Sequence, residues 1–222
     1  FSPRFNFTPD AMTLPWLILL GSALALLVPM PAFYSRKHSY RDLHQLEIER
    51  RNGSRWGMVK QLLRFSGHWI DLARGLLGSI GVLMTIDQLA TISPLYARHA
   101  AWADSVVPLT LATLCVMLIA FFFHYPGKSL APIPFVAGTL LVLVPPSVAF
   151  LALLLGLFFA AKLRALSLFF ILLAPALALL GFFLDRLLWP SLAGAVLAAT
   201  PIVLAFFRHR DLVIPVRRPR SS

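Results

Sequence analysis

A short polar segment between two long apolar runs carries residue types that suit anion binding. The segment reads Pro126-Gly127-Lys128-Ser129. Proline followed by glycine is a turn signal. A turn that presents backbone N–H groups beside a lysine and a hydroxyl offers the donors that a phosphate needs. The segment therefore predicts a small anion-binding loop with Lys128 as its cation. The alternative interpretation of Lys128 is an ordinary surface cation that helps to set the topology.

A second polar feature lies inside an earlier apolar run. Asp71 and Arg74 stand three positions apart, which places them on one face of a helix, where they can pair. Charged side chains are costly in lipid unless they pair or face the bundle interior. The spacing predicts a salt bridge near the inner surface, and a catalytic role for Asp71 is the alternative.

Several other kinds of chemistry find no support in the sequence. The six histidines are dispersed and the chain has one cysteine, so neither a metal site nor an internal disulfide is expected. The chain has no P-loop, no dinucleotide fingerprint and no series of buried carboxylates. A transporter or channel needs a polar path across the membrane, and the later apolar runs offer almost none. We therefore expect no metal and no cofactor.

The elements that position these residues are membrane-spanning helices. The chain is 59% hydrophobic and only 13% charged, which is too apolar for a soluble domain. Its apolar runs show no strand alternation, so helices rather than a barrel are expected. The sequence predicts an all-α integral membrane protein, one domain over residues 1–222, with about seven spans. These are Met12 to Tyr34, Trp69 to Ser93, Ser105 to Phe123, Leu130 to Pro145, Pro146 to Ala161, Ala165 to Leu184, and Leu187 to Phe207.

The division at Pro145-Pro146 follows from the chemistry of proline. Each proline removes a backbone donor and clashes with the preceding turn, so one long helix through both is not expected. The distribution of the 20 Lys and Arg residues favours the same division. With seven spans and the amino end outside, most of them fall inside, as the positive-inside rule requires.

This topology places two basic segments at the inner face of a cell inner membrane. The first is loop 35–67, in which Arg41 to Arg51 predicts a short amphipathic helix on the membrane surface. The second is the tail, 208–222. The net charge of +11 is explained by this topology and by contact with anionic lipid headgroups, so no nucleic acid partner is expected.

Six short motifs follow one another in an order typical of a known family. They are Gly21-Ser22, Arg36-Lys37-His38, Asp71-Leu72-Ala73-Arg74-Gly75, Gly127-Lys128-Ser129-Leu130-Ala131, Leu163-Arg164-Ala165-Leu166-Ser167-Leu168, and Phe207-Arg208-His209-Arg210-Asp211-Leu212. Their order and sidedness resemble those of the PlsY-type membrane glycerol-3-phosphate acyltransferases. That resemblance covers most of the chain.

The resemblance implies a fold and a reaction. It implies a seven-helix bundle, amino end out and carboxyl end in, with an active site on cytoplasmic loops. The reaction implied is acyl transfer from acyl phosphate to glycerol 3-phosphate, without a metal or cofactor. By resemblance, the catalytic candidates are Ser54, Lys128 and Asp71, with Ser39 as the alternative serine. The candidates for binding phosphate and substrate are Arg36, Lys37, Gly127, Ser129 and Arg208.

The departures from the family pattern fall in the loops. Pro126 and Ser129 replace two glycines of the phosphate loop, and the first loop does not reproduce the family's glycine-rich signature. Two hypotheses follow. The chain is either an acyltransferase of phospholipid biosynthesis or a non-catalytic relative. The second would be a lipid-binding or structural subunit that contacts anionic headgroups and other membrane subunits.

Overall fold

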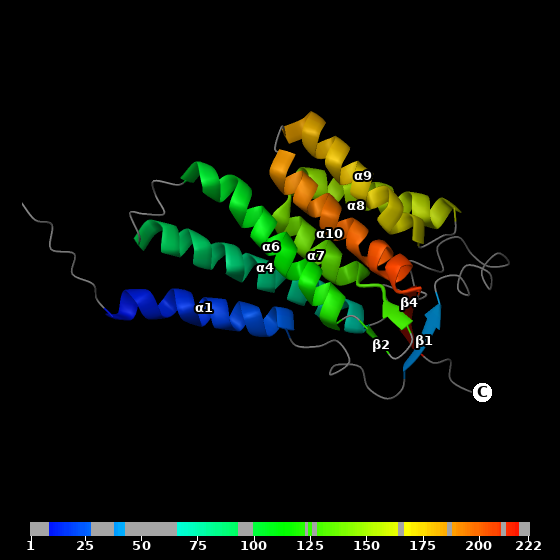
Figure 1. The fold of residues 1–222 in the computed structure, drawn as a ribbon, viewed down its shortest axis with the longest axis horizontal. Coiled ribbons are helices and arrows are strands. Elements are labelled where there is room, and N and C mark those ends of the chain that lie inside the picture. The colour runs from blue at the N-terminus through cyan, green and yellow to red at the C-terminus, as the bar shows by residue number, and fades with distance from the viewer. Residues whose placement is uncertain are drawn as a thin grey trace, which may run out of the picture.

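The computed structural model describes residues 9–27, 38–42, 66–92, 100–122, 124–125, 128–163, 167–185, 188–209 and 212–217. Most of these residues lie in seven α-helices: α1 (Pro9–Leu27), α4 (Ser66–Ile92), α6 (Ala100–Phe122), α7 (Ile133–Leu143), α8 (Pro146–Leu163), α9 (Ser167–Leu180) and α10 (Leu188–Phe207). A π-helical turn, η2 (Gly181–Asp185), follows α9. The helices run back and forth as an elongated bundle (Figure 1). The prediction of a helical bundle is confirmed.

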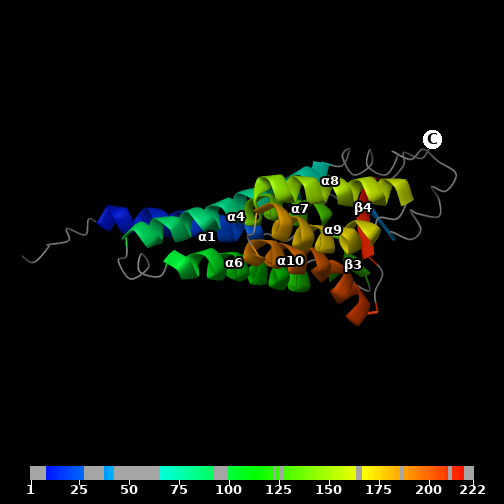
Figure 2. The same ribbon diagram turned by 90° about the horizontal axis from the view of Figure 1, so that it is seen from above.

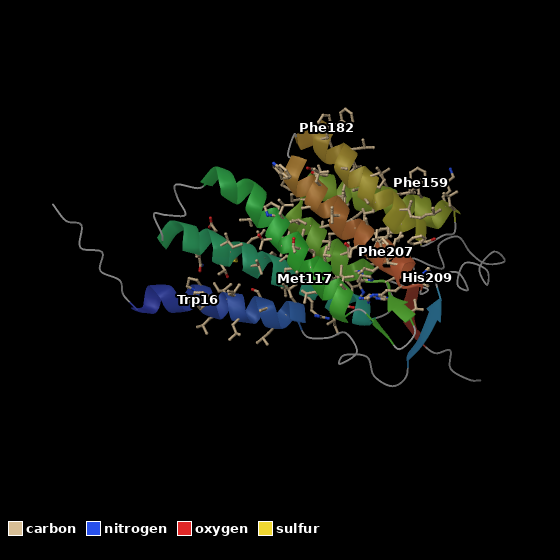
Figure 3. The ribbon with its side chains drawn as sticks, in the orientation of Figure 1. Trp16, Met117, Phe159, Phe182, Phe207 and His209 are labelled. Atoms are coloured by element: carbon tan, nitrogen blue, oxygen red, sulfur yellow. The ribbon has the colours of Figure 1, made fainter. Side chains whose placement is uncertain are left out.

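The outer surface of the bundle is apolar. Large side chains point away from it, among them Trp16, Phe182 and Phe207, which are 59%, 58% and 75% exposed (Figure 3). Such a surface suits lipid rather than water.

Four described stretches are long and apolar enough to cross a membrane: Gly67–Gln88, Pro146–Leu163, Ser167–Leu184 and Trp189–Phe207. Three shorter apolar helical stretches are Leu14–Leu26, Val107–Ala120 and Ile133–Leu143. These features indicate a multi-pass membrane protein.

The chain breaks where its two adjacent prolines stand. Helix α7 ends at Leu143, Val144 is extended with φ −113° and ψ 148°, and α8 begins at Pro146. Proline is tolerated there because the first residues of a helix have no intrahelical partner for their N–H groups. The predicted division at Pro145-Pro146 is confirmed. With 11 residues, α7 is about 16 Å long, which is shorter than a hydrocarbon core of about 30 Å.

Helix α7 lies against α4 with the two backbones in contact. A Cβ atom added to Gly75 would collide with the carbonyl oxygen of Phe135, and one added to Gly138 would collide with that of Leu72. Small residues allow this approach between membrane helices, and Cα–H groups then face carbonyl oxygens. Because both glycines are buried, they fix the α4–α7 crossing.

Helix α1 packs on another side of α4, again at glycines. A Cβ atom on Gly78 would meet the side chain of Leu26, and one on Gly81 would meet Ser22. The Thr85 hydroxyl lies 2.8 Å from the Gly81 carbonyl oxygen and 3.4 Å from that of Pro15 on α1. Helix α4 therefore holds α1 and α7 on separate faces.

A four-stranded sheet lies at one end of the bundle (Figures 1 and 2), which we call the sheet end. Its strands, in the order β1-β4-β3-β2, are β1 (His38–Asp42), β4 (Leu212–Arg217), β3 (Lys128–Leu130) and β2 (His124–Tyr125). β4 pairs antiparallel with β1 and parallel with β3, and β2 and β3 form an antiparallel hairpin. The sequence did not predict this sheet.

The sheet corrects one prediction. The amphipathic helix expected from Arg41 to Arg51 is wrong for Arg41 and Asp42, which lie in β1; residues 43–51 are outside the described residues. The reason lies in the tail, where Leu212–Arg217 is rich in residues that favour strands. The hydrogen bonds of β4 give the first loop a strand partner that its own sequence does not reveal.

Pro215 limits how far β4 can form hydrogen bonds with β3, while leaving its pairing with β1 intact. The Ala131 N–H donates to the Val213 carbonyl oxygen at 2.9 Å, so residue 213 turns its backbone groups toward β3. Alternate residues of a strand face the same neighbour, so residue 215 also turns toward β3 and away from β1. Proline has no N–H to donate there, and the pairing with β3 accordingly ends at Val213. The pairing with β1 continues past Pro215 to Arg217.

Helix α10 ends at a residue in a left-handed conformation, and this leads to a prediction. His209 has φ 48°, and its N–H donates to the Phe206 carbonyl oxygen at 3.1 Å. This position favours glycine, because a Cβ atom costs roughly 1–2 kcal/mol in the left-handed region. His209→Gly should raise the free energy of unfolding by about 1 kcal/mol, measured by thermal unfolding in detergent. His209→Val should lower it, and unchanged melting of both variants would contradict the assignment.

Candidate anion-binding site at the sheet end

Three segments that are far apart in the sequence meet at the sheet end. β1 comes from the first polar loop, β2 and β3 from the loop between α6 and α7, and β4 from the tail. Lys128 pairs with Tyr125 across the hairpin, and Ser129 lies beside Leu212 in the parallel pair. The structure thus brings the strand that contains Lys128 and Ser129 beside the strand that follows Arg208.

Four of the predicted site residues lie outside the described residues. They are Arg36, Lys37, Ser54 and Gly127. For Lys128 and Ser129 the backbone position in β3 is described, whereas Asp71 and Arg208 are described with their side chains. In the described part of the chain, the candidate site therefore consists of the backbone of the hairpin and these two side chains.

The backbone that follows Lys128 offers few donors to an anion. The Ala131 N–H already donates to the Val213 carbonyl oxygen, and Pro132 and Pro134 have no N–H. The start of α7 is also enclosed, since Ala131 is 2% exposed and Ile133 is 6% exposed. The usual anion site at a helix N-terminus is reduced here because two of its N–H groups are missing and that of Ala131 is used. An anion at this end is better held by side-chain cations.

Asp71 and Arg74 form the predicted salt bridge, and both are buried. One Arg74 Nη lies 3.0 Å from an Asp71 carboxylate oxygen, and the two side chains are 8% and 2% exposed, respectively. Arg74 also donates from Nε to the Ala25 carbonyl oxygen at 2.9 Å and from its other Nη to that of Leu26 at 3.0 Å. These carbonyls belong to the last turn of α1, where intrahelical donors run out. Arg74 therefore joins α4 to the end of α1.

Arg208 makes a similar contact on the other side of the bundle. It follows the last residue of α10, and its guanidinium donates to the Ala120 carbonyl oxygen at 3.1 Å. Ala120 lies in the last turn of α6, directly before the hairpin of β2 and β3. A cation at a helix C-terminus is stabilised by the helix dipole. Arg208 thereby ties the start of the tail to the end of α6.

The two arginine contacts were only partly visible in the sequence. Spacing within α4 indicated the Asp71–Arg74 pair, but the carbonyl partners of both arginines come from other helices. Position could have pointed to one of them, because Ala120 stands near the end of the predicted span Ser105 to Phe123, whereas Ala25 lies well inside the predicted span Met12 to Tyr34. Through these contacts, Asp71, Arg74 and Arg208 each have a structural partner.

His68 is a further buried polar residue that the sequence reading did not single out. It is 6% exposed and lies one turn before Asp71 on the same helix. Within the part of the chain that the structure describes, no group of three His, Cys, Asp or Glu side chains is close enough to hold a metal ion. Because His68 is buried one turn before Asp71, it belongs with Asp71 and Arg74 to the buried polar residues of α4 near the sheet end.

The described part of the sheet end combines two arginine-capped helix ends with strands drawn from basic segments. No model of a protein family, no curated protein and no solved structure matches this chain. Chemically, cations gathered at the end of an apolar bundle suit the binding of a negatively charged group at headgroup depth. At this end, the buried carboxylate of Asp71 is held by Arg74.

Proposed function

We propose that this chain is a PlsY-like membrane protein that binds phosphate-bearing lipid headgroups at the sheet end, as a non-catalytic lipid-binding or structural subunit of a larger membrane complex. The proposal is supported mainly by the structural contacts that three polar groups at this end already make. Asp71 pairs with Arg74, Arg208 caps α6, and the Ala131 N–H donates to β4. Because these groups are engaged, we expect an anion at this end to be bound mainly by the surrounding cations.

The proposed topology is seven spans in a cell inner membrane, amino end outside and carboxyl end inside. The sheet supports it, because strands that pair with one another lie on one side of a membrane. An even number of crossings must then separate β1 from β3 and β3 from β4. Among the described residues, two helices, α4 and α6, lie between the first pair, and four helices, α7 to α10, lie between the second. The short α7 with α8 would form a hairpin that returns to the sheet end.

Lipid binding is tested with the purified full chain in nanodiscs of phosphatidylcholine with and without phosphatidic acid. Lys128→Ala is expected to weaken the binding of phosphatidic acid about fivefold, because one cation near the surface contributes about 1 kcal/mol. Lys162→Ala is the matched control, since Lys162 is an exposed cation on α8 whose Nζ lies over the Phe158 ring at 5.7 Å. Equal losses in the two variants, or no preference for phosphatidic acid, would contradict a site at the hairpin.

The second candidate function is acyl transfer from acyl phosphate to glycerol 3-phosphate. It is favoured by one observation: two of the motif matches lie side by side, since Ser129 pairs with Leu212 and Leu130 with Val213. In this reaction a glycerol hydroxyl oxygen bonds to the acyl carbon. The acyl–phosphate bond breaks, and phosphate leaves with the electron pair and takes up the hydroxyl proton through a base. Lys128, Arg36 and Arg208 would hold the phosphates by charge.

Turnover separates the two candidates. Purified protein supplied with acyl phosphate and labelled glycerol 3-phosphate should form no labelled acyl product if the chain is non-catalytic. Product formation that is lost in Lys128→Ala and kept in Lys162→Ala would instead establish the acyltransferase. Stable co-purification of other membrane subunits without turnover would support the non-catalytic role.

A further inference from the structure

The carboxyl-terminal strand occupies the middle of the sheet. In the order β1-β4-β3-β2, β4 is the neighbour of both β1 and β3. Within the described residues, β1 enters the sheet through β4, from His38 opposite Arg217 to Asp42 opposite Val213. β1 and the hairpin of β2 and β3 are therefore joined through β4 and not paired with each other.

β4 is also the strand that fixes the sheet to the bundle. Val213 is fully buried and belongs to the apolar core, together with Ala131 and Ile133 at the start of α7. Its carbonyl oxygen accepts the Ala131 N–H at 2.9 Å. At the other end of the connection, Arg208 is held on the α6 carbonyl of Ala120. The tail is thus anchored before and within β4.

The strands that remain without β4 are weak. β2 has two residues and β3 has three, and an isolated two-stranded hairpin is marginal in water. β1 would lose the described strand that pairs with it. The positions of β1 and of the strand that contains Lys128 therefore both depend on the same six-residue strand.

We infer that β4 assembles the anion-binding site by joining β1, the strand that contains Arg41, to the hairpin that contains Lys128, so that both strands contribute to binding one phosphate headgroup. β4 acts as a positioning element: affinity for the headgroup depends on the pairing of β4 with β1 as well as on the cations themselves. This inference rests on the proposed function, since it concerns the same site. It adds that the tail contributes a strand to the site in addition to its positive charge.

One backbone hydrogen bond provides a sharp test. Because residue 213 turns toward β3, residue 214 turns toward β1, and the Ile214 N–H donates into the β1–β4 ladder. Ile214→Pro removes that donor without changing any charge, whereas the matched control Ile214→Val keeps it. Both variants are compared in the full chain by phosphatidic acid binding in phosphatidylcholine nanodiscs. If pairing falls to about a tenth of the molecules, the apparent Kd should rise about tenfold in Ile214→Pro, and it should be unchanged in Ile214→Val.

Cysteine cross-linking reports the pairing independently of any ligand. The chain has one cysteine, the buried Cys115, so Cys115→Ala gives a background without thiols. His38→Cys with Arg217→Cys joins a register pair that is not hydrogen-bonded, where Cα atoms are typically about 4.5 Å apart. This pair should cross-link, and the off-register pair His38→Cys with Ile214→Cys should not. Adding Ile214→Pro to the register pair should abolish its cross-link, while Ser129→Cys with Leu212→Cys should still react.

The outcomes separate the inference from the proposed function. If the cross-link is lost in Ile214→Pro while phosphatidic acid affinity stays unchanged, β4 does not assemble the site and the inference is overturned. If the register pair never cross-links, the inference also fails. If the cross-links behave as expected but the unsubstituted chain does not prefer phosphatidic acid, the proposed function fails and the inference falls with it. Loss of the cross-link together with a tenfold weaker affinity supports both.

Discussion

Replacing Arg74 by methionine is expected to lower the free energy of unfolding by about 3–5 kcal/mol, the usual effect of removing one partner of a buried ion pair. The substitution leaves the Asp71 carboxylate, 2% exposed, without the Arg74 guanidinium that lies 3.0 Å from it. It also removes the donors to the Ala25 and Leu26 carbonyl oxygens at the end of α1. Thermal unfolding of the purified protein in detergent measures the loss.

The design of this experiment separates charge from packing. In the double variant Arg74→Met with Asp71→Leu, the carboxylate that lost its Arg74 partner is also removed, so much of the lost stability should return. Arg74→Lys should remain destabilised, because an ammonium cannot reach three acceptors in the fixed geometry of a guanidinium. Full stability of Arg74→Met would show that this contact does not hold α1 to α4.

Gly138→Ala is expected to be the second most damaging single change. Its Cβ atom would collide with the Leu72 carbonyl oxygen of α4, which belongs to a backbone and cannot rotate away. Forcing an extra methyl group into such a contact costs about 1–3 kcal/mol. Because α7 is enclosed by α4 on this side, the two helices must separate. The expected result is a lower melting temperature of the purified protein.

Gly21 provides the matched control for this prediction. A Cβ atom added there meets nothing within 4 Å, although Gly21 is also a helical glycine. Gly21→Ala should therefore be neutral or stabilise by up to about 1 kcal/mol, through the better helix propensity of alanine. If Gly138→Ala melts at the same temperature as Gly21→Ala, the close α4–α7 crossing does not exist in the folded protein.

The two predictions concern one structural role of α4. Arg74 fixes the end of α1, and Gly75 and Gly138 fix α7, so the helix that carries Asp71 organises its neighbours. A carboxylate in this position serves the packing of the bundle at the sheet end. For the acyl transfer hypothesis, a catalytic role of Asp71 would need its pairing with Arg74 to change during the reaction. Retained turnover in the double variant would remove Asp71 from the list of catalytic candidates.

The sequence by itself determined the helical membrane architecture, the break at Pro145-Pro146 and the Asp71–Arg74 pair. Each follows from local physics: long apolar runs, the missing N–H of proline, and the three-residue spacing of a helix face. The polar segment at Lys128 lies between two helices, with its strand β3 at the sheet end, and its role in anion binding stays a prediction. The roles of Ser54, Arg36, Lys37 and Gly127 stay predictions, as these residues are outside the described part of the chain.

Only the tertiary structure decided how the sheet end is assembled. β1 and β4 come from opposite ends of the chain and pair residue by residue, and neither segment shows its partner in its own pattern. The same holds for Arg74 and Arg208, whose carbonyl acceptors lie on α1 and α6. Strand pairing and helix capping across elements depend on backbone N–H and carbonyl groups that nearly every residue possesses, so residue type carries little record of them. Such contacts become visible only when the helices bring the segments together.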